Sequence, residues 1–185
     1  MSSQPYQTAA ASTRSVMEQV AAEQMGNETP CASWKVNELI NHIVGAQHLF
    51  LAGAKGTPPV GADADFASGD YLAAFDEVVA EATETFSQEG FAGQMFNLPF
   101  GDMPGGALIG LAATDTFQHG WDLAKATEQS TDLAPELAAS LLAQSKKAIQ
   151  DSFRGPEGAP FGAEQQSAEG APNADQLAAF LGRSA

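Results

Sequence analysis

Three ionisable side chains stand at helical spacing in the segment GALIGLAATDTFQHGWDLAKA, which is otherwise mostly apolar or small. Asp115, His119 and Asp122 occupy positions i, i+4 and i+7, so they share one face of a helix. Apolar or small residues on nearly every other face indicate that this helix is buried on most sides. Because burial of a lone carboxylate costs several kcal/mol, we expect a cation to lie against this face.

A further histidine, His42, belongs to the apolar face of an earlier predicted helix. At 100° per residue it falls on the same arc as Ala46 and Leu49, so its imidazole is expected to point inward. His48 projects from the opposite side of that helix and is expected to be exposed, and we assign it no role. The chain has three histidines, and two of them are therefore candidates for chemistry.

The spacing Asp-x-x-x-His places a carboxylate oxygen and an imidazole nitrogen on neighbouring turns, where both can bind one metal ion. His42 from a neighbouring helix could complete the set with Asp115 and His119. Two histidines and a carboxylate with an open position are typical of a catalytic zinc, or of another divalent metal with nitrogen and oxygen ligands. The alternative is a hydrogen bond between Asp115 and His119 within their helix, with His42 a core histidine bonded to a backbone carbonyl.

Other residues near these positions have two interpretations each. Asp122 either accepts a hydrogen bond from a ligand histidine and fixes its tautomer, or it is an exposed residue paired with Lys125. Cys31 either reaches the metal as a thiolate or is a small buried cysteine. Trp34 and Trp121 are expected to be core residues or pocket walls.

The elements that must position these side chains are helices. Apolar periodicity predicts helices over residues 8–25, 34–51, 69–87, 104–127 and 132–153, followed by a short helix over 175–181. Asp132 is the expected N-cap of the fifth helix, with Pro135 in its first turn. Residues 29–33 predict a turn, and residues 52–67 and 88–103 predict long loops, the second with a short extended piece at 95–98. Because no long segment alternates with period two, we expect an all-α helical bundle.

Length and composition favour one domain over residues 1–185, with residues 154–185 forming an extended tail that carries the short helix. The 8 basic residues are scattered and are outnumbered by 23 acidic ones, which argues against binding to nucleic acid or anionic membranes. No apolar run approaches the roughly 18 to 20 residues that cross a bilayer, and no signal peptide is visible, so we expect a cytoplasmic protein. Apolar bundle faces are compatible with a homodimer.

Three segments carry a resemblance to a known family: PCASWKVNELINHIVGAQ (30–47), TDTFQHGWDLAKAT (114–127) and QLAAFLGR (176–183). They resemble the metal-binding proteins grouped with mycothiol-dependent maleylpyruvate isomerase, in the DinB-like superfamily. The most specific part is W-x-V-x-E-L-x-x-H followed by H-G-W-D-L-A. The resemblance implies a DinB-like four-helix bundle with an additional short C-terminal helix and long crossover loops. It also implies His42, Asp115 and His119 as metal ligands, with Asp115 in place of the glutamate expected in the isomerase.

The resemblance implies a function as well. Zinc is the first expectation for the metal, with nickel, iron or manganese as alternatives, and mycothiol is the expected cosubstrate. The partners would be a small-molecule thiol and an electrophile, and the activity a thiol transferase or isomerase. A non-catalytic metal- or ligand-binding bundle is the alternative. Because the extra C-terminal domain expected of the isomerase has no counterpart here, maleylpyruvate does not follow as the substrate.

Overall fold

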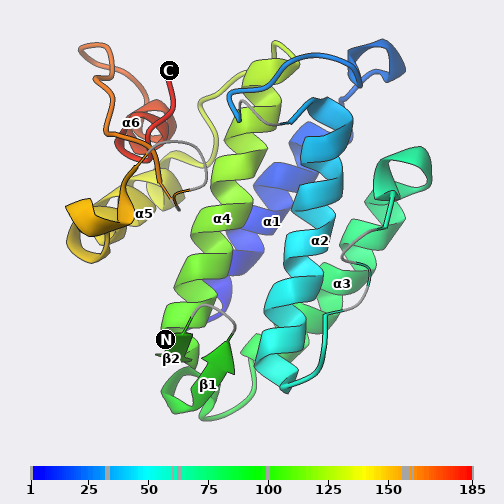
Figure 1. Ribbon diagram of the computed structural model, residues 1–185, viewed down its shortest axis with the longest axis vertical. Helices are drawn as coiled ribbons and strands as arrows, with labels where there is room; N and C mark the ends of the chain where they lie inside the picture. The colour runs from blue at the N-terminus through cyan, green and yellow to red at the C-terminus, as the bar shows by residue number, and fades with distance from the viewer. Residues whose placement is uncertain are drawn as a thin grey trace.

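The computed structural model describes residues 2–31, 34–59, 61, 64–98, 101–155, 159 and 161–184. Parts of the turn expected at 29–33 and of the loop expected at 52–67 therefore lie outside the described residues. The helices and strands, shown in Figure 1, are α1 (Gln4–Met17), α2 (Val36–Lys55), α3 (Tyr71–Phe86), β1 (Met95–Leu98), β2 (Gly101–Pro104), α4 (Gly105–Ala126), α5 (Pro135–Ala148) and α6 (Asn173–Phe180).

Helices α1 to α4 form the bundle. Helix α1 packs along α4, and α2 packs against both α3 and α4. Helix α1 also contacts α3, which closes the bundle, while α5 and α6 pack against each other beside α4 (Figure 1). The only sheet among the described residues is the antiparallel pair of β1 and β2. The predicted all-α class is confirmed, and β1 coincides with the predicted extended piece.

The first helix differs from its prediction at both ends. It begins at Gln4, because Pro5 fits the first turn of a helix, and it ends at Met17 rather than near residue 25. Val20 and Met25 keep the apolar spacing that suggested a longer helix, but they pack on the core from an irregular segment. That segment contains a 3₁₀ turn at Ala22–Gln24. Apolar spacing alone could not distinguish the two arrangements.

The end of α2 and both ends of α5 also differ from their predictions. Helix α2 continues to Lys55 and ends where Gly56 adopts the left-handed conformation, with φ of 65°. Asp132 is not the N-cap of α5, because that position is held by Ala134. Helix α5 ends at Ala148, and a 3₁₀ turn covers the last residues of the predicted segment.

A buried polar network joins three helices of the bundle. The hydroxyl of Tyr6 in α1 donates to Gln47 Oε1 in α2 over 2.9 Å. Gln47 Nε2 donates in turn to Thr116 Oγ1 in α4 over 3.0 Å, and Thr13 Oγ1 donates to the carbonyl of Thr116. These bonds satisfy polar groups in the core, so they fix the relative positions of α1, α2 and α4.

Helix α1 approaches α4 closely at Gly120. A Cβ atom built on Gly120 would lie 2.2 Å from Thr13 Oγ1 and 3.2 Å from Thr13 Cα. A larger residue at this position would therefore push the two helices apart. None of the helices that the structure describes has both the length and the apolar character needed to cross a membrane.

We expect Gly120→Ala to lower the free energy of unfolding by about 1 to 3 kcal/mol, the usual cost of overpacking a tight core. Gly110→Ala is the matched control on the same helix, because a Cβ atom there meets no described atom within 4 Å. Alanine at position 110 should raise stability by up to about 1 kcal/mol through helix propensity. Urea unfolding of both variants tests this, and equal effects would contradict the close approach at Gly120.

Candidate metal centre

The structure brings together the three residues predicted from the sequence as metal ligands. His42 comes from α2, and Asp115 and His119 come from the adjacent helix α4. One ligand atom from each lies within 4.8 Å of the others. The imidazole rings of His42 and His119 are 4.5 Å apart between centroids and nearly perpendicular. Two nitrogen donors and one oxygen donor therefore converge on one place.

Two of these converging atoms have no hydrogen-bond partner among the described residues. His42 Nε2 and Asp115 Oδ2 are buried, and no described residue pairs with them. His119 Nε2 lies 3.7 Å from Asp115 Oδ1, which is too long for a hydrogen bond. The described residues therefore show no hydrogen bond between Asp115 and His119, and no backbone carbonyl that pairs with His42 Nε2. Because buried polar atoms are normally paired, this donor set fits a group that the chain itself does not supply.

Asp122 is wholly buried on the same face of α4, and its carboxylate accepts hydrogen bonds from several sides. His119 Nδ1 lies 3.0 Å from its Oδ2, and Gln118 Nε2 donates to its Oδ1 over 3.3 Å. Arg183 donates from Nε to Oδ1 over 2.9 Å and from Nη2 to Oδ2 over 3.1 Å. Arg183 is the cation that a buried carboxylate requires. The exposed arrangement of Asp122 with Lys125 is therefore wrong.

The contact with Asp122 fixes the orientation of His119. A carboxylate accepts hydrogen bonds, so Nδ1 carries the proton and Nε2 faces Asp115 and His42. A carboxylate behind a histidine is the arrangement that orients ligand histidines in metal proteins. The interpretation of Asp122 as a residue that fixes the tautomer of His119 agrees with this geometry.

The ionisable groups of the centre have strongly displaced pKa values. Burial, helped by the nearby charge of His119, lowers the pKa of His42 to about 3. Burial would also lower the pKa of His119, but the carboxylates of Asp115 and Asp122 outweigh it and raise this pKa to about 10. Burial raises the pKa of the Asp115 carboxyl. For Asp122, His119 and Arg183 outweigh burial and lower the pKa to about 2.

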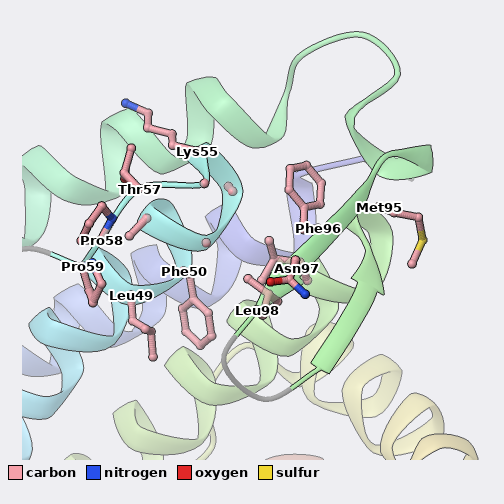
Figure 2. Close-up of a pocket in the computed structure, with 15 residues that line it drawn as sticks. Leu49, Phe50, Lys55, Thr57, Pro58, Pro59, Met95, Phe96, Asn97 and Leu98 are labelled. Carbon is pink, nitrogen blue, oxygen red and sulfur yellow. The ribbon is translucent and has the colours of Figure 1, made fainter.

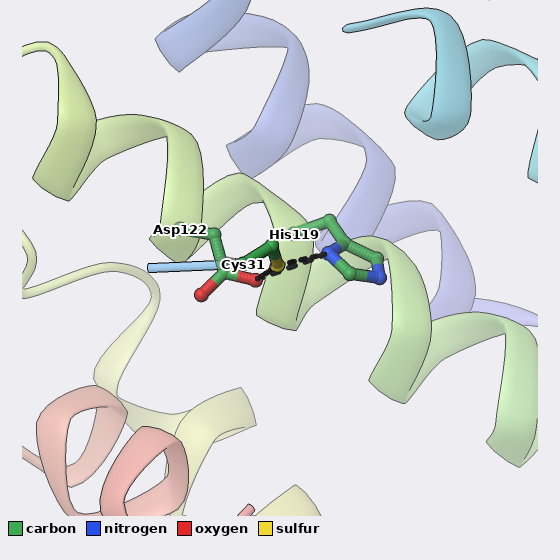
Figure 3. A group of neighbouring side chains, drawn as sticks. All are labelled: Cys31, His119 and Asp122. Atoms are coloured by element: carbon green, nitrogen blue, oxygen red, sulfur yellow. Dashed lines mark hydrogen bonds and ion pairs between the residues drawn. The ribbon is translucent and has the colours of Figure 1, made fainter. Parts of the chain in front are cut away.

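Cys31 belongs to a second group of candidate ligands, with His119 and Asp122 (Figure 3). Its thiol donates to Asp122 Oδ2 over 3.1 Å, and Arg183 Nη2 donates to its sulfur over 3.2 Å. His119 Nδ1 and both oxygens of Asp122 already have hydrogen-bond partners, unlike His42 Nε2 and Asp115 Oδ2. The first group is therefore the better candidate, and Cys31 takes part in the hydrogen bonds around Asp122.

The aromatic residues near the site have different environments. Trp34 stacks on the ring of His42, with 4.2 Å between centroids, so it is a wall of the site. Trp121 is fully buried, and its Nε1 donates to Asp175 over 2.8 Å, so it is a core residue. His48 is partly buried rather than exposed and stacks on Phe66 away from the three candidate ligands.

Two cavities adjoin the candidate ligands, and Asp115 lines both. A cavity of about 410 Å³ on the α2 side is also lined by His42 and Trp34. A cavity of about 220 Å³ on the other side is also lined by His119 and Arg183. A larger one, of about 730 Å³, lies between the end of α2 and β1 (Figure 2), and none of the three candidate ligands lines it.

The sequence matches the family described as "Mycothiol maleylpyruvate isomerase N-terminal domain" over residues 6–124. The chain belongs to this family. Two relatives, from two strains of Mycobacterium tuberculosis, are each 42% identical over 180 residues, which cover 96% of this chain and 95% of the relative. Both carry the name of uncharacterised proteins. No solved structure matches the chain with significance.

Two residues of the candidate site in this mycothiol maleylpyruvate isomerase family member were not identified from the sequence. The buried carboxylates indicated that a cation is needed, but Arg183 lies 61 residues after Asp122 with no periodic pattern to connect them. Its only signal was its place in the segment QLAAFLGR. Gln118 looked like an ordinary polar residue between its neighbours, although it is only 4% exposed.

We expect Asp122→Asn to lower the free energy of unfolding at pH 7 by about 3 kcal/mol, because it removes one partner of a buried ion pair. The lowered pKa of Asp122 means that its contribution is present above about pH 4 and is lost as the pH falls through about 2. The difference between wild type and variant should therefore shrink over that interval.

Urea unfolding across this pH range measures the effect. Asp76→Asn is the matched control, because Asp76 pairs with Arg14 at the surface, where such pairs contribute about 0 to 1 kcal/mol. Similar small losses in both variants would mean that the contacts of Asp122 do not stabilise the fold.

Proposed function

We propose that this protein binds a divalent metal, with zinc the expected ion, through His42, Asp115 and His119, and that the centre activates a low-molecular-weight thiol. The observation that carries the metal proposal is a pair of buried atoms, His42 Nε2 and Asp115 Oδ2, which lie beside His119 Nε2 and have no partner among the described residues. Two imidazoles and one carboxylate suit zinc and also nickel, iron or manganese. Three protein ligands leave a position for another molecule.

The surrounding residues prepare this donor set. Asp122 holds the proton on Nδ1 of His119, so the Nε2 nitrogen is the one left for the metal. The pKa of His42 is lowered to about 3, so this imidazole is neutral at pH 7, which is the form that binds metals. The pKa of His119 is raised to about 10, so this imidazole must release its Nε2 proton when the metal binds. Trp34 covers the His42 ring, and Arg183 holds Asp122 in place.

A thiol is the substrate class that membership of this family supports. A bound divalent metal would lower the pKa of a coordinated thiol and hold a thiolate at neutral pH. Such a nucleophile serves addition to an activated double bond, isomerisation, or transfer of the thiol to an electrophile. Cavities of about 410 and 220 Å³, on the two sides of Asp115, give access to the site. We therefore favour a thiol transferase or isomerase over a non-catalytic metal-binding bundle.

The metal proposal predicts about one divalent metal ion per purified chain, bound at one site of three ligands. His42→Ala and His119→Ala should lose most of it, and Asp115→Asn should bind it more weakly because an amide lacks the compensating charge. His48→Ala and Cys31→Ser are matched controls that should keep the wild-type content. Elemental analysis decides the matter. Full metal in both histidine variants, or loss of metal in Cys31→Ser alone, would contradict the assignment.

The thiol proposal predicts a sulfur-to-metal charge-transfer band when mycothiol is added to the cobalt-substituted protein. The band should saturate with thiol concentration and should be missing in His119→Ala. Optical titration follows coordination without requiring knowledge of the electrophile. If protein shown to hold cobalt gives no band with mycothiol or smaller thiols, the non-catalytic function is the correct one.

A further inference from the structure

A cleft runs along α4 from the candidate metal centre toward α5 and the C-terminal tail. It consists of two adjoining cavities, of about 220 and 360 Å³, which share Leu111, Thr114 and Phe161. Its inner end is lined by Asp115 and His119, and its outer part includes Gly110. We call these two cavities the α4 cleft. It offers space for a molecule that reaches the ligand residues from the side opposite α2.

One buried acceptor that lines the α4 cleft has no partner in the described part of the chain. Gln118 lines the inner cavity and is only 4% exposed. Its Nε2 donates to the carboxylate of Asp122, which can only accept, so the orientation of the amide is fixed and Oε1 points away from Asp122. No described residue donates to Oε1. A molecule that fills the cleft would satisfy this atom by supplying an O–H or N–H donor.

Among the described residues that line the cavity on the α2 side, only the candidate ligands have a buried side-chain atom without a hydrogen-bond partner. Asn41 bonds through its amide nitrogen to Asp65 and through its oxygen to the backbone of Ala67. Glu38 accepts a hydrogen bond from the backbone of Lys35. Glu38 is exposed, so water can solvate its carboxylate, whereas Gln118 Oε1 is buried and has no partner among the described residues.

We infer that the α4 cleft binds the body of the thiol cosubstrate, with the sulfur beside Asp115 and His119 and a hydroxyl or amide donor on Gln118 Oε1. This inference rests on the proposed function and names the part of the site that selects the thiol. Phe161 and Arg183 close the cleft from the tail, and both lie outside residues 6–124, which match the family. The selected class is a thiol whose body carries hydroxyl or amide groups.

Two glycines allow each side of the centre to be filled separately. A Cβ atom on Gly110, in the α4 cleft, or on Gly45, in the cavity beside His42, meets no described atom within 4 Å. Both glycines lie inside helices, so a side chain with higher helix propensity should not harm the fold. Gly110→Leu and Gly45→Leu therefore form a matched pair, and thermal unfolding and metal content show that both remain folded and loaded.

The experiment is an optical titration of the cobalt-substituted proteins with mycothiol and with 2-mercaptoethanol, a thiol too small to extend into the α4 cleft. Gly110→Leu should raise the apparent Kd for mycothiol by about tenfold or more, as expected when a pocket is filled, and leave 2-mercaptoethanol binding unchanged. Gly45→Leu should bind both thiols as wild type does.

Three results would overturn the inference. Wild-type affinity of Gly110→Leu for mycothiol would show that the body lies elsewhere, and selective loss of mycothiol in Gly45→Leu would place it on the α2 side. Equal loss of both thiols in Gly110→Leu would show a disturbed centre rather than a blocked cleft. If wild type gives no band with either thiol, the proposed function itself fails, and the inference fails with it.

Discussion

The buried carboxylate of Asp122 is the constraint on which the arrangement of the centre depends. A charge with no exposed surface is stable only when donors surround it, and here Gln118, His119 and Arg183 all donate to it. These donors come from α4 and from the end of the chain, and Cys31 adds a contact from the segment before α2. The same carboxylate therefore holds the C-terminal tail against the bundle and orients the histidine beside it.

This arrangement explains why Nδ1 of His119 is hydrogen-bonded while its Nε2 faces the other two candidate ligands. Its Nδ1 faces Asp122, so its Nε2 faces Asp115 and His42, whose buried atoms lack partners among the described residues. The bundle positions these groups because the polar network of Tyr6, Gln47 and Thr116 fixes α2 against α4. The unsatisfied atoms are consequently held in place at some cost in stability, as is usual for functional sites.

The sequence was most informative where one helix determines the geometry. The spacing of Asp115, His119 and Asp122 requires a common face, and the position of His42 on its helical wheel requires an inward direction. Contacts between segments far apart in the chain produce no such spacing in the sequence. Arg183 reaches Asp122 from a tail without periodicity, and Gln118 acquires its role only because Asp122 fixes its amide. The predicted end of the first helix was wrong for a related reason, because Val20 and Met25 reach the core from a segment outside the helix.

We propose that Asp122 leaves Nε2 of His119 free to complete a metal site with His42 and Asp115. A crystal structure of the zinc-loaded protein, with anomalous diffraction at the zinc absorption edge, tests it most directly. We expect zinc bonded to Nε2 of both histidines and to the Asp115 carboxylate at about 2.0 to 2.2 Å, with Asp122 still bonded to Nδ1 of His119. Zinc bound instead between the sulfur of Cys31, Nδ1 of His119 and Asp122 would contradict it.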